Sequence, residues 1–331
     1  MEKRKLGVLD VSAVGLGCMG FSHAYGAATE KNEAIHMIQE AVSVGYTFFD
    51  TAEIYGTPES PFDNEVLVGE ALKSCRDKVV IATKFGIRFD TSSGKVPYPI
   101  VTNSRPERIR ESVEGSLKRL QTDYIDLYFQ HRIDTDTPPE EVAGVMAEII
   151  KEGKIRAWGI SEATEDYLRR ANAVCPVAAV ENRYSMMARH YEPLFPVLEE
   201  LGVGLVAFSP MANGLLTGKY GKDSKFDPKT DYRSAMPQFS ADSHEKNRAL
   251  LDLLHETADR KNATPGQISM AWMMCKKPLI VPIPGTRKLE RLKENAGAAA
   301  ISLTAEEVAA LDRALDEIPM SEVFGGTKIK K

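Results

Sequence analysis

The chain has 331 residues, of which 43% are hydrophobic, so it can bury a sizeable core and is not globally disordered. Its 42 Lys and Arg and 47 Asp and Glu give a net charge of -5, which argues against a dedicated nucleic-acid-binding protein, because such proteins are normally basic. No apolar run approaches the roughly 18 residues of a membrane-spanning helix, and residues 1–10 hold no apolar segment of a secretory signal. The cysteines at positions 18, 75, 175 and 275 form no CxxC motif, which favours reduced thiols in a cytoplasmic protein.

Strand-like and helix-like segments alternate almost to the end of the chain. In chain order, the strand candidates are Val14–Gly17, Thr47–Asp50, Val79–Lys84, Asp126–His131, Ile155–Ser161, Val177–Asn182, Gly204–Ser209 and Leu279–Pro284. The helix candidates are Lys31–Ser43, Asn64–Lys73, Arg105–Leu120, Glu140–Glu152, Glu165–Ala173, Tyr191–Leu201, Glu245–Lys261 and Thr264–Cys275. Most strand candidates are continuously apolar, which is typical of parallel strands covered by helices. Eight of them favour an α/β fold of the (β/α)8 TIM-barrel type, although pattern alone does not separate a closed barrel from an open doubly wound sheet.

Further segments add to this alternation. Residues Lys3–Val11 predict an N-terminal hairpin, and Thr304–Ile318 predicts an extra C-terminal helix with a capping box. Ser104 is predicted to cap the helix that starts at Arg105, with a Glu at the third helical position. Met211–Ser243 is a long polar segment of the kind that is usually functional or mobile. No linker or repeat is visible, so we expect one domain over residues 1–331.

A glycine-rich motif near the start, Gly15-Leu16-Gly17-Cys18-Met19-Gly20, matches GxGxxG and follows a strand. In a dinucleotide-binding Rossmann unit a helix opens directly after this motif, so that its N-terminus meets the pyrophosphate. Here the next helix begins only near Lys31. We therefore interpret the motif as accidental and expect its glycines to allow a tight turn at a strand end.

Three consecutive apolar strands end in strongly polar residues: Asp50, Lys84 and His131. Barrel enzymes carry their reactive groups at the C-terminal ends of strands, so these side chains should face one mouth, and Tyr55 lies five residues beyond Asp50. Singly, each residue is more often a cap, a surface charge or a packing group. The joint arrangement is what indicates a catalytic site.

These four residues suit proton transfer to an oxygen. An unperturbed tyrosine has a pKa near 10, and a neighbouring ammonium lowers it by stabilising the phenolate. A carboxylate keeps that ammonium charged and in place, and a histidine can orient the substrate oxygen or share the proton. The set of Asp50, Lys84, Tyr55 and His131 is therefore predicted to protonate an oxygen that gains negative charge, as in carbonyl reduction by hydride.

The sequence resembles the aldo-keto reductase superfamily over nearly its whole length. The similar stretches are Gly45–Gly56 (GYTFFDTAEIYG), Leu120–Leu127 with Gln130 and His131, and Val281–Arg287 with Glu294 and Asn295. The resemblance implies a (β/α)8 barrel that binds NADP(H) and reduces aldehydes or ketones to alcohols. It implies Tyr55 as general acid, Lys84 as the group that lowers its pKa, Asp50 as the partner of Lys84, and His131 as the group that orients the carbonyl.

The resemblance also implies a cofactor site after the late strands. The expected contacts are Met19, Ser161, Glu181, Phe208, Ser209, Met211, Gly214, Lys219, Gly285, Thr286, Arg287, Arg291, Glu294 and Asn295. Phe208 would stack under the nicotinamide. Thr286, Arg287 and Arg291 would bind the adenosine 2′-phosphate and favour NADPH over NADH, with both arginines on one helix face if the helix begins by Arg287.

Two positions depart from the superfamily pattern. The usual Ser-Asn after the fifth strand is Ser161-Glu162 here, and the usual Gln at the end of the sixth strand is Glu181. The Ser-Glu-Ala sequence is similar to a branch that includes pyridoxal and perakine reductases. An ionised Glu accepts hydrogen bonds but donates none, so these two positions differ chemically from the amides that they replace.

Alternative functions follow from the same residues. A regulatory NADPH-binding protein resembling potassium-channel β subunits shares the barrel, but those proteins carry Asn where this chain has His131. A lyase that forms a Schiff base on Lys84 is also compatible with a lysine at a strand end. We expect a small carbonyl substrate, no metal, and no nucleic-acid or membrane partner. Its pocket is predicted from the loops Phe21–Thr29, Phe85–Tyr98, Arg132–Pro138, Met211–Asp242 and the tail after Ile318, with Tyr25, Phe85, Tyr98 and Arg132 as candidate contacts.

Overall fold

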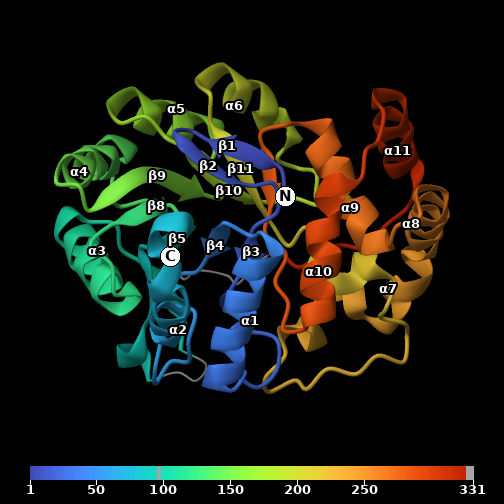
Figure 1. Ribbon diagram of the computed structural model, residues 1–331, viewed down its shortest axis with the longest axis horizontal. Coiled ribbons are helices and arrows are strands. Elements are labelled where there is room, and N and C mark those ends of the chain that lie inside the picture. The colour runs from blue at the N-terminus through green and yellow to red at the C-terminus, as the bar shows by residue number, and fades with distance from the viewer. Residues whose placement is uncertain (95–97, 326–331) are drawn as a thin grey trace.

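Eight parallel strands curl into the wall of a barrel in the computed structural model of the protein (Figure 1). Around the sheet, from its last strand to its first, they are β12 (Ile280–Pro282), β11 (Gly204–Phe208), β10 (Ala179–Arg183), β9 (Ile155–Ser161), β8 (Ile125–Gln130), β5 (Val80–Phe85), β4 (Phe48–Asp50) and β3 (Leu16–Gly17). Main-chain N–H groups of Gly15 and Gly17 donate to the carbonyls of Pro282 and Pro284 at 2.9 and 3.4 Å. These bonds join the two outer edges, so the predicted TIM-barrel class is confirmed.

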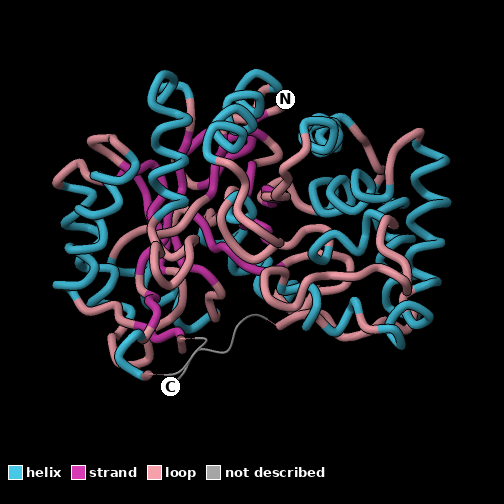
Figure 2. Tube along the Cα trace, turned by 90° about the horizontal axis from the view of Figure 1, so that it is seen from below, coloured by secondary structure: helices cyan, strands magenta, loops and turns pink. Residues whose placement is uncertain are grey.

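Helices cover the outside of the strands, as Figure 2 shows. The helices that follow strands are α1 (Lys31–Val44), α2 (Asp63–Leu72), α3 (Pro106–Leu120), α4 (Pro139–Lys151), α5 (Glu165–Val174), α6 (Phe195–Leu201), α9 (Pro265–Lys276) and α10 (Leu289–Gly297). Further helices are α7 (Ala241–Lys246), α8 (Arg248–Lys261) and the predicted C-terminal α11 (Ala305–Glu317), which has its Thr304–Glu307 capping box. Among the residues that the structure describes, no helix combines the length and apolar character needed to cross a bilayer.

The structure describes residues 1–94 and 98–325. Two predicted segments lie partly outside the described residues: the pocket loop Phe85–Tyr98 at residues 95–97, and the tail at residues 326–331. The single domain expected over residues 1–331 stays a prediction.

Two apolar clusters follow from the alternation of side chains along each strand. Residues that point outward, such as Ile81 and Tyr128, pack with the helices in the larger cluster. Residues that point inward, such as Phe48, Ala82 and Phe129, fill the barrel interior. The interior is thus a packed core at one end, which leaves only the other end open for a ligand.

The predicted N-terminal hairpin is confirmed, and it closes one end of the barrel. Strands β1 (Lys3–Leu6) and β2 (Leu9–Ser12) pair antiparallel. Leu6, Leu9 and Val11 are buried among the inward-facing strand residues. Figure 1 shows the hairpin lying across the strands. A ligand must therefore enter from the opposite end, where the parallel strands terminate.

The glycine-rich motif is not a Rossmann site, as predicted, and Gly20 lies in a turn after β3, but Gly15 and Gly17 serve close packing and not a turn. Residues Met19–Phe21 form a single 3₁₀ turn (η1), and α1 starts ten residues later. A Cβ on Gly15 would lie 2.5 Å from the Phe48 ring, and one on Gly17 would lie 2.8 Å from the Ile283 carbonyl oxygen. Glycine is needed here because β3 approaches β4 and β12 too closely for a side chain.

Three local predictions need correction. Ser104 does not cap α3, whose N-cap is Arg105 without a side-chain cap bond, because the Ser104 hydroxyl accepts from the Gln130 amide at 2.9 Å instead. Helix α10 begins at Leu289, so Arg287 lies in the preceding loop and does not share a helix face with Arg291. The loop after β5 contains an unpredicted antiparallel pair, β6 (Ile87–Phe89) with β7 (Ile100–Thr102).

The polar segment Met211–Ser243 contains more regular structure than predicted, and the helix predicted after it is interrupted. The segment contains short 3₁₀ turns, η5 (Ala212–Thr217), η6 (Tyr232–Ala235) and η7 (Pro237–Phe239), and the start of α7. The predicted helix Glu245–Lys261 is divided between α7 and α8. Helix α6 is preceded by a 3₁₀ turn, Glu192–Leu194 (η4), so it is shorter than predicted.

Candidate active site

Polar side chains continue the inward-facing rows at the open end of the barrel. On each of four strands, the polar residue stands two positions after an inward apolar residue and therefore points the same way. The pairs are Phe48 and Asp50 on β4, Ala82 and Lys84 on β5, Phe129 on β8 with His131 directly after that strand, and Ala179 and Glu181 on β10. The period of two in the strand backbone thus places two carboxyl groups, an ammonium and an imidazole around one floor.

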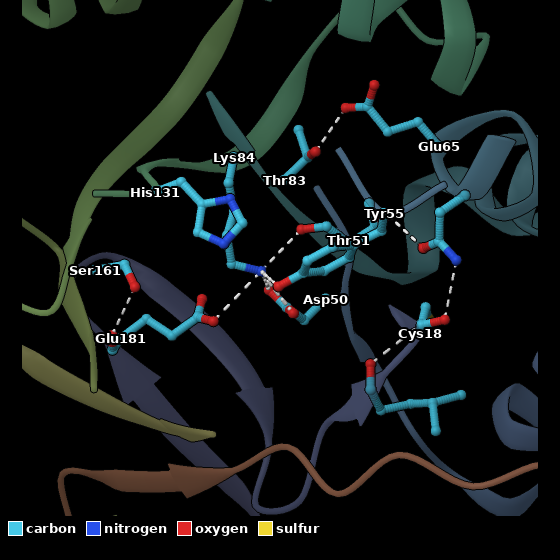
Figure 3. Close-up of polar contacts among 12 residues, drawn as sticks. Cys18, Asp50, Thr51, Tyr55, Glu65, Thr83, Lys84, His131, Ser161 and Glu181 are labelled. Atoms are coloured by element: carbon cyan, nitrogen blue, oxygen red, sulfur yellow. Dashed lines mark hydrogen bonds and ion pairs between the residues drawn. The ribbon is translucent and has the colours of Figure 1, made fainter. Parts of the chain in front are cut away.

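Lys84 is the centre of this floor. Its ammonium donates to both carboxylate oxygens of Asp50 at 2.6 and 2.7 Å and to the Thr51 carbonyl at 2.9 Å. It also lies 3.3 Å from the Tyr55 hydroxyl and 3.3 Å from the Glu181 carboxylate (Figure 3). Lys84 is fully buried. Sequence analysis placed Asp50 and Tyr55 here, but assigned Glu181 to a cofactor contact and not to Lys84.

The protonation of the floor is set by burial and by these contacts. Burial alone would lower the pKa of Lys84, but the fields of Asp50, Glu181 and Tyr55 outweigh it and raise that pKa, so the amine stays charged. Burial and the charge of Asp50 raise the pKa of Glu181 to about 8. Burial raises the pKa of Asp50 as well, and Lys84 and Glu181 oppose that rise, so two carboxyl groups with raised pKa values face one ammonium. A permanently protonated Lys84 is a poor nucleophile, which argues against the Schiff-base alternative.

Tyr55 stands on the loop that follows β4, and main-chain bonds hold that loop against β5. Thr51 and Glu53 donate their N–H groups to the carbonyls of Ala82 and Lys84 at 2.9 and 3.2 Å. The Ser22 hydroxyl donates to the Tyr55 carbonyl at 2.5 Å. Burial raises the pKa of Tyr55 above its usual value although the Lys84 ammonium acts to lower it. The phenol is therefore protonated at neutral pH.

His131 completes the group. Its ring meets the Tyr55 ring edge-on, with centroids 5.6 Å apart at 85°. Burial, together with the charges of Arg132 and Lys84, lowers its pKa well below the usual range, so the imidazole is neutral. Its Nδ1 is buried and has no hydrogen-bond partner in the described part of the chain.

A cavity of about 540 Å³ opens above this floor. Asp50, Tyr55 and His131 line it, whereas Lys84 is buried against them. All residues that were expected to touch a cofactor also line it: Met19, Ser161, Glu181, Phe208, Ser209, Met211, Gly214, Lys219, Gly285, Thr286, Arg287, Arg291, Glu294 and Asn295. The structure therefore brings every predicted catalytic and cofactor-binding residue to one cavity or its floor.

Comparison with known proteins agrees with this geometry. The Aldo/keto reductase family matches residues 13–316. The chain belongs to the aldo/keto reductase family. It is 39% identical to probable aldo-keto reductase 1 of Glycine max (97% of this chain, 90% of that protein) and 40% identical to aldo-keto reductase str7 of Strobilurus tenacellus (98% and 94%). It also resembles the solved glycerol dehydrogenase AKR11B4 from Gluconobacter oxydans, with a TM-score of 0.86, 28% identity and 98% coverage of both chains.

Aldo/keto reductase membership implies NAD(P)H-dependent carbonyl reduction on a small substrate, so the chain is an oxidoreductase. The relatives are named as reductases or dehydrogenases, and none of these names favours the channel-subunit alternative.

In this aldo/keto reductase, the rim of the cavity after β12 carries the basic side chains. The Arg287 guanidinium donates to the carbonyls of Gly20 and Ala27 at 2.5 and 2.6 Å, while its Nη2 is buried without a partner in the described chain. Arg291 forms an ion pair with Glu294, which also accepts from the Thr264 hydroxyl at 2.8 Å. Arg287 is therefore the rim arginine with a donor still open.

The loop after β11 has an unusual backbone. Ser209, Ala212 and Asn213 adopt positive φ angles of 52°, 47° and 60°, and Gly214 follows at 100°. Residues other than glycine adopt such angles rarely, and successive turns of this kind form concave arrays of N–H groups that suit phosphates. The strain lies in a segment that lines the cavity.

Several cavity residues were not predicted, or were placed differently. Tyr25 and Arg132 line the cavity as expected, but Phe85 packs outward against Tyr128, and Tyr98 is not part of the lining. Arg183 and Phe324 also line it. Arg183 could have been found from the strand period, since it stands two positions after the inward-facing Glu181 on β10.

Proposed function

We propose that the protein reduces aldehydes or ketones to alcohols with NADPH, and that Tyr55 is the general acid. The observation that carries the proposal is the fully buried Lys84 ammonium, 3.3 Å from the Tyr55 hydroxyl and anchored by Asp50 at 2.6 Å. A phenol needs such a fixed positive charge to release its proton at neutral pH. The NADPH preference, the pyridoxal and perakine reductase-like branch and the cytoplasmic location remain predictions.

The residues present fit an elongated dinucleotide. Buried polar atoms that line the cavity lack partners in the described chain at two separated places: His131 Nδ1 and Glu181 Oε2 at the floor, and Arg287 Nη2 at the rim. Unsatisfied buried groups are rare in folded proteins and indicate a ligand when they surround a cavity. A dinucleotide would reach both places, with Ser161, Glu181 and Phe208 at the nicotinamide and the loop from Ser209 to Lys219 at the pyrophosphate.

The rim supports the choice of NADPH. Thr286, Arg287 and Arg291 line the cavity beyond β12 and present a hydroxyl and two guanidinium groups. A guanidinium with an open N–H donor binds a phosphate monoester more strongly than a ribose hydroxyl, because the hydrogen bond is charge-assisted. The adenosine 2′-phosphate of NADPH would meet Arg287, with Glu294 and Asn295 near the adenine.

Side chains of the protein would transfer the proton to the substrate oxygen. When bound, the reduced nicotinamide supplies the hydride for the carbonyl carbon. The neutral His131 orients the carbonyl oxygen at the open side of the floor, and Tyr55 donates its hydroxyl proton to that oxygen as negative charge develops on it. Lys84 stabilises the phenolate left on Tyr55, and Asp50 holds the lysine in place.

The test is Tyr55→Phe, which removes the hydroxyl and keeps the ring that packs against His131. We expect kcat/KM for a reactive aldehyde with NADPH to fall by about 10³-fold, within the range for general acid catalysis. Fluorescence titration should give an NADPH affinity within about threefold of the wild type. Unchanged turnover in the variant would refute the acid role of Tyr55.

A further inference from the structure

Arg183 is a buried arginine with no polar partner. It is 6% exposed, lines the cavity, and forms no hydrogen bond or ion pair with residues 1–94 or 98–325. Burial lowers its pKa, although Glu162 partly opposes this effect. Its nitrogen atoms are not among the fully enclosed unpartnered atoms of the described chain, so the guanidinium faces the cavity, where an anionic ligand would compensate its charge.

The other arginines that line the cavity all have polar partners. Arg132 contacts Glu162, the Ser161 hydroxyl and the His131 carbonyl, and Arg233 contacts Asp231 and the Tyr220 hydroxyl. Arg287 donates to the carbonyls of Gly20 and Ala27, and Arg291 pairs with Glu294. Arg183 differs from each of them because the structure offers it aromatic faces instead of acceptors.

The Arg183 guanidinium lies over the rings of two phenylalanines. Its Cζ lies 5.2 Å from the centroid of Phe208 and 5.7 Å from that of Phe324. Aromatic faces attract a guanidinium but accept no ordinary hydrogen bond from it, so its N–H donors remain available to a planar acceptor such as a carboxylate.

The charges around Arg183 do not cancel. The ionisable groups that act on its pKa include Glu162, Arg132, Tyr191 and Tyr25, and burial together with the charge of Arg183 in turn lowers the pKa of His190. Glu162 is the only one of them that is negative at neutral pH, and it is paired with Arg132 at 3.2 Å. Two arginines thus share one carboxylate, and one positive charge is left over on this wall.

We propose that Arg183 binds the carboxylate of the substrate, so that the protein prefers carbonyl compounds that carry an acidic group away from the reacting carbon. This proposal rests on the proposed carbonyl reduction. Arg183 stands two residues beyond Glu181 on β10, about 6–7 Å farther toward the open mouth. A carbonyl at Tyr55 and a carboxylate at Arg183 are therefore separated by a spacer of several atoms, such as a benzene ring.

The test compares 4-carboxybenzaldehyde with its methyl ester, which share the reacting aldehyde and differ in charge at the far end. In the full-length wild type with NADPH we expect a higher kcat/KM for the acid. Arg183→Met keeps an apolar side chain of similar length and should reduce the acid-to-ester ratio by about 10- to 30-fold, as expected for the loss of a charge-assisted contact. Turnover of the ester should change by less than about threefold.

A binding measurement makes the result independent of turnover. Terephthalate has a carboxylate at each end and no reducible carbonyl. By titration calorimetry we expect the wild type to bind it about tenfold or more tightly than Arg183→Met. Because the variant removes a charge without a counter-ion, its melting temperature should not fall.

The matched control is Arg248→Met, which makes the same change of charge on the exposed face of α8, where the side chain is 64% exposed. It should leave the acid-to-ester ratio unchanged. A wild-type ratio near one, or a ratio that Arg183→Met does not alter, overturns the proposal. A tenfold loss of NADPH affinity in Arg183→Met without a change of ratio would overturn it too, by assigning the guanidinium to a cofactor phosphate. If the wild type reduces neither aldehyde, carbonyl reduction itself is contradicted, and terephthalate binding still tests Arg183.

Discussion

The floor and the rim of the cavity differ in how their positively charged side chains are compensated. At the floor, Lys84 is fully buried and surrounded by the carboxyl groups of Asp50 and Glu181. At the rim, Arg287 contacts only main-chain carbonyls and keeps one buried N–H without a partner in the described chain. The difference indicates that the cation of the floor is compensated without a ligand, so the floor can hold a proton donor in one geometry, whereas the rim leaves a cation open for an incoming anion.

The largest expected effect comes from breaking the floor. Lys84→Met removes the ammonium and leaves Asp50 and Glu181 as buried acids without a cation. We expect kcat/KM for an aldehyde to fall by about 10³-fold or more, because Tyr55 loses the charge that stabilises its phenolate. NADPH titration should still detect binding, since the rim is untouched. Retained turnover would show that the ammonium is not needed for proton transfer.

A smaller effect is expected at the rim. Arg287→Ala should weaken NADPH binding by about tenfold, as for the loss of one charge-assisted contact, and should change NADH binding by less than about threefold. Lys293→Ala removes the same charge from an exposed position on α10 and serves as the control. Equal losses for NADPH and NADH would contradict the assignment of Arg287 to the 2′-phosphate.

The smallest effect sharpens the description of the floor. Above about pH 8 Glu181 ionises and adds negative charge beside Tyr55, which raises the pKa of the phenol further. The single-turnover reduction rate of the wild type should therefore decline above about pH 8. The activity of Glu181→Gln at pH 7 should differ from that of the wild type by about two- to fivefold. Because glutamine does not ionise, the decline in rate should move to higher pH in this variant. An identical pH profile in both proteins would rule out titration of Glu181.

The same substitution has a stability readout with a defined sign. The folded-state pKa of Glu181, about 8, lies above the ordinary value of 4.5. Unfolding therefore releases a proton between about pH 4.5 and 8, and this group makes the free energy of unfolding fall as the pH rises through that window. Glu181→Gln cannot release this proton, so its denaturant midpoint should depend less on pH across the window. Equal pH dependence in the two proteins would contradict a raised pKa.

Much of the site could be predicted because it obeys local rules. Each barrel strand is a short apolar run, and the residue at its end shares the mouth with the ends of its neighbours. Asp50, Lys84 and His131 were found in this way, and Tyr55 by its short distance in sequence from Asp50. The rim residues after β12 were placed at the cavity by the family resemblance.

Other features depend on which strands meet. The second carboxylate on Lys84 comes from Glu181, 97 positions later in the chain (181 − 84), and the packing that requires glycine at position 17 comes from Ile283. The N-cap predicted for Ser104 failed because the Gln130 amide, on a neighbouring strand, binds its hydroxyl. Likewise, the sequence gives no sign that Arg183 differs from an ordinary charged residue, whereas the fold buries it without an ion pair to any residue of 1–94 or 98–325.

The sequence by itself determined the alternation of the barrel strands with their helices and the polar residues at the strand ends, because both follow from the repeat of the backbone over a few residues. Only the tertiary structure decided which charges are paired, which are left open and how burial shifts their protonation. These properties depend on distances between segments that are remote in the chain and on the exclusion of water, and no local pattern encodes either of them.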